Sequence, residues 1–105
     1  MKLMRRVQIS DEAERDLISI IRYTEAHWGK TKRKDYLQPF NKCIGMLAKN
    51  PRIGSSREDI CAGLYAWPHG SHLVFYRFDD ETIKIGRILH ARMDIAARLH
   101  DDADN

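Results

Sequence analysis

The distribution of apolar and polar residues predicts a β-hairpin over residues 72–90. Apolar side chains fill most positions of 73–78 and return through 83–89, and three acidic residues, 79–81, separate the two runs. Short apolar runs bounded by turn residues are typical of strands. Because apolar residues fall on both sides of each strand, we expect both faces of the hairpin to be covered.

The face on which each hairpin side chain lies depends on the length of the turn. A three-residue turn, 79–81, puts Arg77 and Arg87 on one face, whereas a two-residue turn, 80–81, puts them on opposite faces. The distinguishing pairs are Phe75–Ile85 and Leu73–Arg87 for the longer turn, and Tyr76–Ile85 and Val74–Arg87 for the shorter one. Simple alternation along the second strand puts Ile83, Ile85 and Leu89 on one side and Ile88 on the other. A shift of one residue exchanges the faces of a strand, so both registers remain open.

The segment before the hairpin predicts a first helix that begins after Ser10. Ser10 is a preferred N-cap residue, and the acidic residues that follow it suit the positive end of the helix dipole. Apolar side chains then recur at steps of three and four residues as far as Trp28. Gly29 is well placed to end this helix in a left-handed conformation.

A second helix is predicted over residues 31–49 from the spacing of its apolar side chains. Pro39 lies inside it, and because proline lacks an N–H group we expect a kink or a start delayed by about one turn. Asn50 ends the helix, since a residue before proline avoids the helical conformation. The two helices together form an α-hairpin.

Four further segments complete the predicted fold. They are a first strand over residues 3–9, a loop over 50–63, a strand over 64–67 closed by a turn at 68–71, and a short final helix over 93–100. Helices separated from consecutive antiparallel strands define the α+β class. We therefore expect one α+β domain over residues 1–105, with an N-terminal strand, an α-hairpin, a three-stranded antiparallel meander and a short C-terminal helix.

Length and composition are those of a small single domain, and they do not indicate a particular function. The chain has 105 residues, enough for one modest core, and no apolar run near the length of a membrane span. Its basic start lacks the apolar region of a signal peptide, so we expect the cytoplasm. Cys43 and Cys61 have neither the spacing of a metal site nor a second pair, and we expect no metal and no cofactor.

Charge leaves the kind of partner open. The net charge of +3 permits an acidic or nucleic-acid partner but does not require one. Four cations lie within five residues, namely Lys30, Lys32, Arg33 and Lys34. They can bind phosphates or form the solvated start of the second helix.

Polar residues near the ends of the predicted strands are the candidates for chemistry. His69 precedes the hairpin and His90 ends its last strand. A histidine near arginines can cleave RNA by acid–base chemistry, although a solvated His69 and a His90 bonded to the backbone explain the same residues. Arg77 and Arg87 interrupt apolar strands, so each lies at an anion-binding surface or in a salt bridge, for example with Asp94 or a carboxylate of the first helix.

Four segments resemble the ParE branch of the RelE/ParE superfamily, the toxins of bacterial type II toxin–antitoxin pairs. They are SDEAERDL at residues 10–17, AKNPRIG at 48–54, GLYAWPHGSHLVFYRF at 63–78 and IGRILHARMDI at 85–95. The resemblance covers nearly the whole chain, and the predicted order of elements agrees with the fold of this family. It implies a toxin that poisons DNA gyrase, blocks replication and growth, and is neutralised by an antitoxin whose C-terminal half folds over the helices and the sheet.

The resemblance also implies an alternative. RelE-like relatives cleave mRNA on the ribosome with basic residues and a tyrosine or histidine at the strand ends, for which Arg77, Arg87 and His90 are the candidates. The gyrase hypothesis needs no catalytic residue. The residues expected to contact the target are His69, Arg77, Arg87, His90 and Arg92, and those expected to bind the antitoxin are Leu17, Ile21, Trp28, Leu37, Phe40 and Tyr76.

Overall fold

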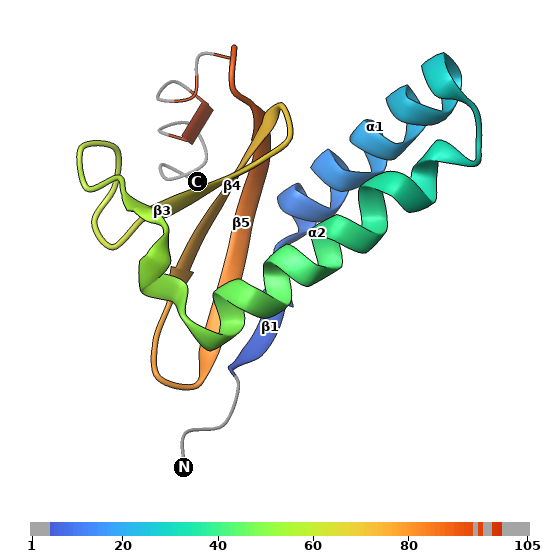
Figure 1. The fold of residues 1–105 in the computed structure, drawn as a ribbon. Helices are drawn as coiled ribbons and strands as arrows, with labels where there is room; N and C mark the ends of the chain where they lie inside the picture. The colour runs from blue at the N-terminus through green and yellow to red at the C-terminus, as the bar shows by residue number, and fades with distance from the viewer. Residues whose placement is uncertain (1–4, 94, 96–97, 100–105) are drawn as a thin grey trace.

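The computed structural model describes residues 5–93, 95, 98 and 99. Its elements follow in the order β1 (Arg6–Ile9), α1 (Asp11–Trp28), α2 (Lys32–Lys49), the 3-10 helix η1 (Pro51–Ile53), β2 (Ser55–Ser56), β3 (Tyr65–His69), β4 (His72–Phe78) and β5 (Thr82–His90). The two long helices form a hairpin on one face of a five-stranded sheet (Figure 1). This arrangement confirms the predicted α+β class.

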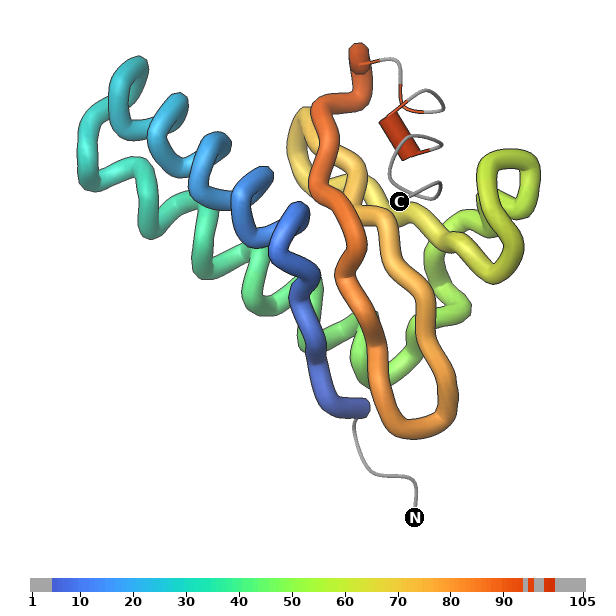
Figure 2. Tube along the Cα trace, turned by 180° about the vertical axis from the view of Figure 1, so that it is seen from behind, coloured from blue at the N-terminus to red at the C-terminus, as the bar shows by residue number. Residues whose placement is uncertain are grey.

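The strands of the sheet lie in the order β1-β5-β4-β3-β2. β1 is parallel to β5 and lies along it (Figure 2), whereas the other neighbouring strands are antiparallel. β3, β4 and β5 are the predicted meander. The prediction of a loop over 50–63 misses β2. Ser55 and Ser56, which lie in that segment, pair with Ala66 and Tyr65 of β3. Residues 3 and 4 of the predicted first strand lie outside the described residues.

α1 begins and ends where the sequence predicts. The Ser10 hydroxyl accepts a hydrogen bond of 3.0 Å from the Ala13 N–H and donates one of 2.7 Å to the carbonyl of Gly86. Gly29 has a φ of 87°, and its N–H donates to the carbonyl of Glu25 at 2.9 Å. The N-cap residue therefore also fixes the start of α1 to β5.

α2 is helical from Lys32 onward, so Pro39 does not delay its start by a turn. Proline removes one intrahelical hydrogen bond, the bond that would reach the carbonyl of Asp35. Asp35 lies on an exposed turn of the helix, where water can bind its carbonyl group. The helix therefore continues through Pro39, and the prediction of a helix over 31–49 is confirmed to within one residue.

β3 is longer than predicted, because Pro68 and His69 belong to the strand and the turn is at Gly70 and Ser71. The φ of Gly70 is 59°, a left-handed conformation that glycine adopts at little cost. Proline is tolerated in a strand whose outer edge is open. β2 pairs only with Tyr65 and its neighbour in β3, so the edge beside Pro68 is open.

β4 and β5 follow the shorter-turn register only next to the turn. Tyr76 lies opposite Ile85, as that register predicts. Phe75, however, lies opposite Arg87, so Gly86 has no partner on β4. One extra residue on one strand of an antiparallel pair is a β-bulge. Neither predicted register therefore holds along the whole hairpin.

Beyond the bulge every pair is shifted by one residue relative to the shorter-turn register. Arg87 lies opposite Phe75 instead of Leu73 or Val74, the partners that the two registers predict. Residues two apart on a strand share a face, and so do cross-strand partners. Arg77 and Arg87 consequently lie on the same face of the sheet, although the turn is the shorter one.

The sheet separates two apolar clusters, so both faces of the hairpin are covered. On the helix side, Ile88 joins Ile83 and Ile85 in a core with α1 and α2. On the other side, Leu89 packs with Phe75 and with the loop between β2 and β3. Simple alternation instead predicts that Leu89 shares a side with Ile83 and Ile85, and that Ile88 lies on the other side. That prediction is wrong because the bulge adds a residue.

The C-terminal segment is described only in part. Half of the predicted helix over 93–100, Asp94 included, lies outside the described residues. Ile95, Arg98 and Leu99 are helical, and Leu99 is buried against the face of the sheet opposite the α-hairpin.

Candidate functional site

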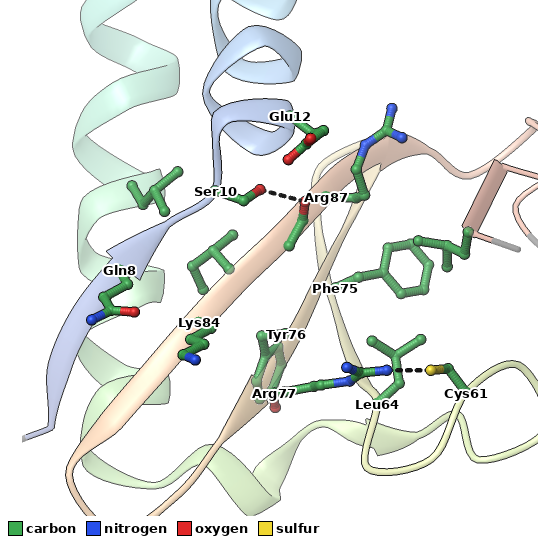
Figure 3. A pocket seen from close by; sticks show the side chains of 14 residues that line it. Gln8, Ser10, Glu12, Cys61, Leu64, Phe75, Tyr76, Arg77, Lys84 and Arg87 are labelled. Carbon is green, nitrogen blue, oxygen red and sulfur yellow. Dashed lines mark hydrogen bonds between the residues drawn. The ribbon is translucent and has the colours of Figure 1, made fainter. Parts of the chain in front are cut away.

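A pocket of about 470 Å³ opens on the face of the sheet opposite the helices (Figure 3). Its apolar lining includes Phe75 from β4 and Leu64 from the loop that covers this face. Its polar lining includes three cations, Arg77, Lys84 and Arg87, the last of which the bulge turns toward this face, and one carboxylate, Glu12 of α1. An apolar floor with a few charged groups at its rim is typical of a binding site.

Arg77 and Lys84 are the exposed cations of this pocket, and they lie directly opposite each other on β4 and β5. Arg77 donates a hydrogen bond to the Sγ atom of Cys61. Among the described residues, no carboxylate lies within ion-pair distance of either cation. Like charges at facing positions of a sheet repel each other. The rim of the pocket therefore favours a negatively charged partner.

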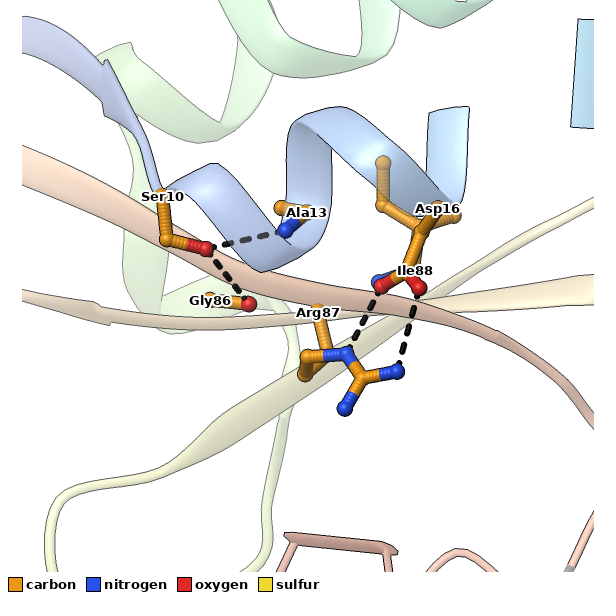
Figure 4. Close-up of polar contacts among 6 residues, drawn as sticks. All are labelled: Ser10, Ala13, Asp16, Gly86, Arg87 and Ile88. Carbon is orange, nitrogen blue, oxygen red and sulfur yellow. Dashed lines mark hydrogen bonds and ion pairs between the residues drawn. The ribbon is translucent and has the colours of Figure 1, made fainter. Parts of the chain in front are cut away.

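Arg87 is held by a carboxylate of α1 (Figure 4). Its Nε and Nη2 atoms donate to the two carboxylate oxygens of Asp16 at 2.8 and 3.0 Å, and both side chains are only 14% exposed. Asp16 also accepts the backbone N–H of Ile88 at 2.9 Å. A salt bridge with the first helix is one of the two explanations that the sequence leaves open for this arginine, and the structure shows it.

Three histidines and a tyrosine gather on the helix side of the sheet. The ring of His72 lies 5.4 Å from that of His90 and 6.1 Å from that of Tyr36, and the ring of His69 lies 5.2 Å from Tyr36. Burial lowers the pKa of His72, and its proximity to His90 and His69 lowers this pKa further. Burial also raises the pKa of Tyr36 to about 12. At neutral pH the imidazole of His72 and the phenol of Tyr36 are therefore uncharged.

The residues proposed from the sequence for RNA cleavage lie on two sides of the sheet. Arg77 and Arg87 line the pocket, whereas His90 lies beside His72 on the helix side. His90 accepts the backbone N–H of Arg92 on its Nδ1 atom at 3.1 Å. The two arginines and the histidine consequently do not face one substrate position.

The thiols and acidic residues do not form a metal centre in the described part of the chain. No three His, Cys, Asp or Glu side chains come together there as ligands. Cys43 is buried and Cys61 is half-buried, and both are free thiols. Burial raises the pKa of Cys43, which keeps this thiol protonated and unreactive.

The α-hairpin exposes more apolar surface than the sequence predicts. Of the residues expected to bind an antitoxin, Leu17, Ile21 and Leu37 are half-buried, and Trp28 is 68% exposed. Ile18 and Tyr23 are exposed by 44% and 63%, and they were missed because they lie off the periodic apolar stripe. Such residues can be found in a sequence as apolar side chains that lie outside the apolar stripe of an amphipathic helix.

Phe40 and Tyr76 were expected to bind the antitoxin, but both side chains are buried. Their exposed fractions are 2% and 0%, and both pack in the core between the helices and the sheet. The Tyr76 hydroxyl donates a hydrogen bond of 2.6 Å to the carbonyl of Pro51. A partner that leaves the fold intact cannot reach either side chain.

The fold combines a helical hairpin on one face of a sheet, a parallel N-terminal strand at the edge of that sheet and a pocket with cations at its rim on the other face. The family described as "ParE toxin of type II toxin-antitoxin system, parDE" matches residues 7–95. The chain belongs to this family and is a toxin of a type II toxin–antitoxin system.

Two curated relatives match along nearly their full length. Toxin ParE1 of Caulobacter vibrioides is 35% identical over 96 residues, which are 91% of this chain and 99% of the relative. Toxin ParE1 of Mycobacterium tuberculosis is 37% identical over 95 residues, which are 90% of this chain and 97% of the relative.

Solved structures agree with the fold. The chromosomal ParDE system from P. aeruginosa matches with a TM-score of 0.70 at 19% identity, covering 83% of this chain and 96% of the other. The toxin–antitoxin complex RelBE2 from Mycobacterium tuberculosis matches with a TM-score of 0.61 at 24% identity, covering 84% of this chain and 99% of the other.

Proposed function

We propose that this toxin acts by binding DNA gyrase and blocking replication, and not by cutting RNA. The observation that carries this proposal is that the sheet separates His90 from Arg77 and Arg87. RNA cleavage needs a group that takes the proton of the 2′-hydroxyl close to the cations that hold the phosphate. The chain belongs to the ParE family, and the resemblance to ParE toxins implies gyrase as the target.

Two exposed cations are the strongest candidates for contact with gyrase. Arg77 lies at the rim of the pocket, and Arg92 follows the end of β5. Arg87 belongs to the same expected set, but its ion pair with a carboxylate of α1 gives it a positioning role. His69 and His90 are half-buried and form the end of the sheet next to Arg92.

A supercoiling assay tests this target. Purified toxin added to gyrase, relaxed plasmid and ATP is expected to stop supercoiling, and Arg77→Glu is expected to raise the required toxin concentration at least tenfold, the effect of about 1.4 kcal/mol of lost contact. Lys42→Glu, an exposed cation on α2, is the matched control and should act as the wild type does. Normal supercoiling in excess toxin would exclude gyrase as the target.

A ribosome-dependent endoribonuclease is the second candidate function. The cationic pocket favours it, because the pocket can hold a phosphate backbone. Primer extension on translated mRNA would then show new cuts in the ribosomal A site that disappear with His90→Ala. Intact mRNA in cells whose growth has stopped would eliminate this alternative.

The apolar surface of the α-hairpin is the proposed site for a cognate antitoxin. Ile18, Tyr23 and Trp28 expose large apolar side chains there, and exposed apolar surface of this kind marks protein contacts. The two solved structures of similar fold are described as a ParDE toxin–antitoxin system and a RelBE2 toxin–antitoxin complex.

Co-purification tests the antitoxin site. The product of the neighbouring gene, co-expressed with the toxin, should remain bound to the wild type and be lost from the double variant Ile18→Asp/Tyr23→Asp. Ile53→Asp, which changes an exposed apolar residue of η1, should retain it. Retention by the double variant would place the contact elsewhere.

We place the toxin in the cytoplasm, where gyrase acts on DNA. In the described part of the chain no helix is long and apolar enough to cross a membrane.

A further inference from the structure

The tip of the α-hairpin combines exposed aromatic rings with a concentration of positive charge. It lies where α1 ends and α2 begins, and it projects beyond the sheet (Figures 1 and 2). Five cations and two carboxylates lie between residues 22 and 35, so this segment alone carries the net charge of +3 of the whole chain. The function proposed above uses none of these cations.

Among the described residues, three of these five cations have no carboxylate within ion-pair distance, namely Arg22, Lys30 and Lys34, and the last two lie on either side of the start of α2. Lys32 pairs with Asp35 at 3.4 Å, and Arg33 pairs with Glu25 at 3.2 Å. Lys30 and Lys34 are exposed. The tip therefore presents uncompensated positive charge on both sides of the start of α2.

Trp28 lies next to this charge. Its side chain is 68% exposed and lines a shallow hollow of about 370 Å³ together with Lys32, Asp35 and Tyr36. The neighbouring Tyr23, 63% exposed, stacks on His27 with ring centroids 3.9 Å apart. An indole left in water at the end of a helix contributes little to the fold, and its face is open for stacking.

We propose that the tip of the α-hairpin binds single-stranded DNA, with phosphates at Lys30 and Lys34 and a base stacked on the indole of Trp28. Exposed aromatic rings beside cations are the arrangement with which proteins hold unpaired nucleic acids. A duplex keeps its bases stacked inside, so it can use the cations but not the indole.

The choice of DNA over RNA rests on the proposed gyrase target, which acts on DNA. The binding itself is a property of the purified toxin and needs no gyrase. A toxin that inhibits gyrase but binds no oligonucleotide would therefore refute this inference alone. A toxin that binds the oligonucleotide but leaves gyrase active would refute the proposed target alone.

Fluorescence anisotropy with a labelled oligo(dT) of about twelve nucleotides tests the inference, since single binding sites span roughly 4–16 nucleotides. Lys30→Glu/Lys34→Glu should weaken binding at least tenfold and reduce the slope of log K against log salt by about 1.4, as expected for two lost phosphate contacts. Arg15→Glu/Lys42→Glu changes the net charge equally with exposed residues outside the tip, and should bind within twofold of the wild type.

Trp28→Ala tests the stacking contact. Binding should weaken roughly tenfold, and the quenching of tryptophan fluorescence by oligo(dT) should disappear although Trp67 remains. Circular dichroism should show unchanged helix content, because Trp28 is exposed at the end of α1.

Four results would overturn the inference. They are absence of binding, equal weakening by the two double variants, equal affinity for duplex DNA of the same length, and displacement of the oligonucleotide by polyglutamate at equal charge. Affinity for oligo(U) ten times that for oligo(dT) would also overturn the assignment to DNA.

Discussion

Gly54 keeps space for the most deeply buried tyrosine of the core. A Cβ atom at this position would overlap the hydroxyl of Tyr76, which donates its hydrogen bond to the carbonyl of Pro51. Tyr76 is 0% exposed, so its ring cannot move aside without disturbing the core. Glycine is required here for space and not for backbone freedom, because its φ is −71°.

The variant Gly54→Ala is therefore expected to lower the free energy of unfolding by about 2 kcal/mol, through overpacking and loss of the tyrosine hydrogen bond. Gly45→Ala is the matched control, because a Cβ atom at this position of α2 meets nothing within 4 Å. It should stabilise the protein by up to about 1 kcal/mol. Urea unfolding measures both, and equal effects of the two variants would contradict the packing argument.

Burial of His72 should lower the free energy of unfolding in mild acid. Burial lowers its pKa below the ordinary value of 6.5, and the neighbouring His90 and His69 add to this effect. As pH falls, the unfolded chain binds a proton at this residue before the folded chain does. The free energy of unfolding therefore decreases below about pH 6.5, until the pH passes the lowered pKa of the folded state.

Urea unfolding at pH 7.5 and pH 5.5 measures this contribution. His72→Gln should lose less stability than the wild type between these two pH values. His27→Gln changes an exposed histidine and should lose as much as the wild type. If His72→Gln and the wild type lose equal stability, burial of His72 does not control the pH dependence.

At the scale of elements, Asp16 joins α1 to β5. It binds the guanidinium of Arg87 and the N–H of Ile88, so one carboxylate satisfies a charge and a backbone donor on the part of β5 that lies beyond its pairing with β1. Asp16→Ala leaves both groups without this partner in a largely buried position and should lower the free energy of unfolding by about 3 kcal/mol. Asp59→Ala removes an exposed ion pair with Arg57 and should leave stability unchanged within error. Equal stability of the two variants would show that the Asp16 pair is not structural.

The helices could be predicted because their signals are local. Ser10 and Gly29 mark the ends of α1 through their own conformations, and the apolar period lies within the helix. The bulge at Gly86 and the pairing of Ser55 with Ala66 could not be predicted, because both depend on residues far apart in the sequence. Because this one bulge was not predicted, Ile88 and Leu89 were assigned to the wrong faces. For the same reason, the shorter turn was expected to put Arg77 and Arg87 on opposite faces.

At the scale of the molecule, the sheet divides the candidate residues into two groups. Sequence reasoning found the arginines and histidines but could not place them, since their faces depend on the register beyond the bulge. Arg77 and Arg87 border the pocket, and His69 and His90 lie near α2. This division favours a toxin that acts by binding, with one cationic face and one apolar helical surface.

Accumulation of cleaved plasmid when purified toxin is added to gyrase tests most directly whether this toxin acts by binding gyrase. We expect linear DNA, released by protease and detergent, in equal amounts with the wild type and with His90→Ala, because no acid–base chemistry at His90 is involved. Antitoxin added in equal amount should abolish the linear product. Plasmid that stays uncut with wild-type toxin, together with mRNA cleavage that depends on His90, would show that the toxin acts on RNA and not on gyrase.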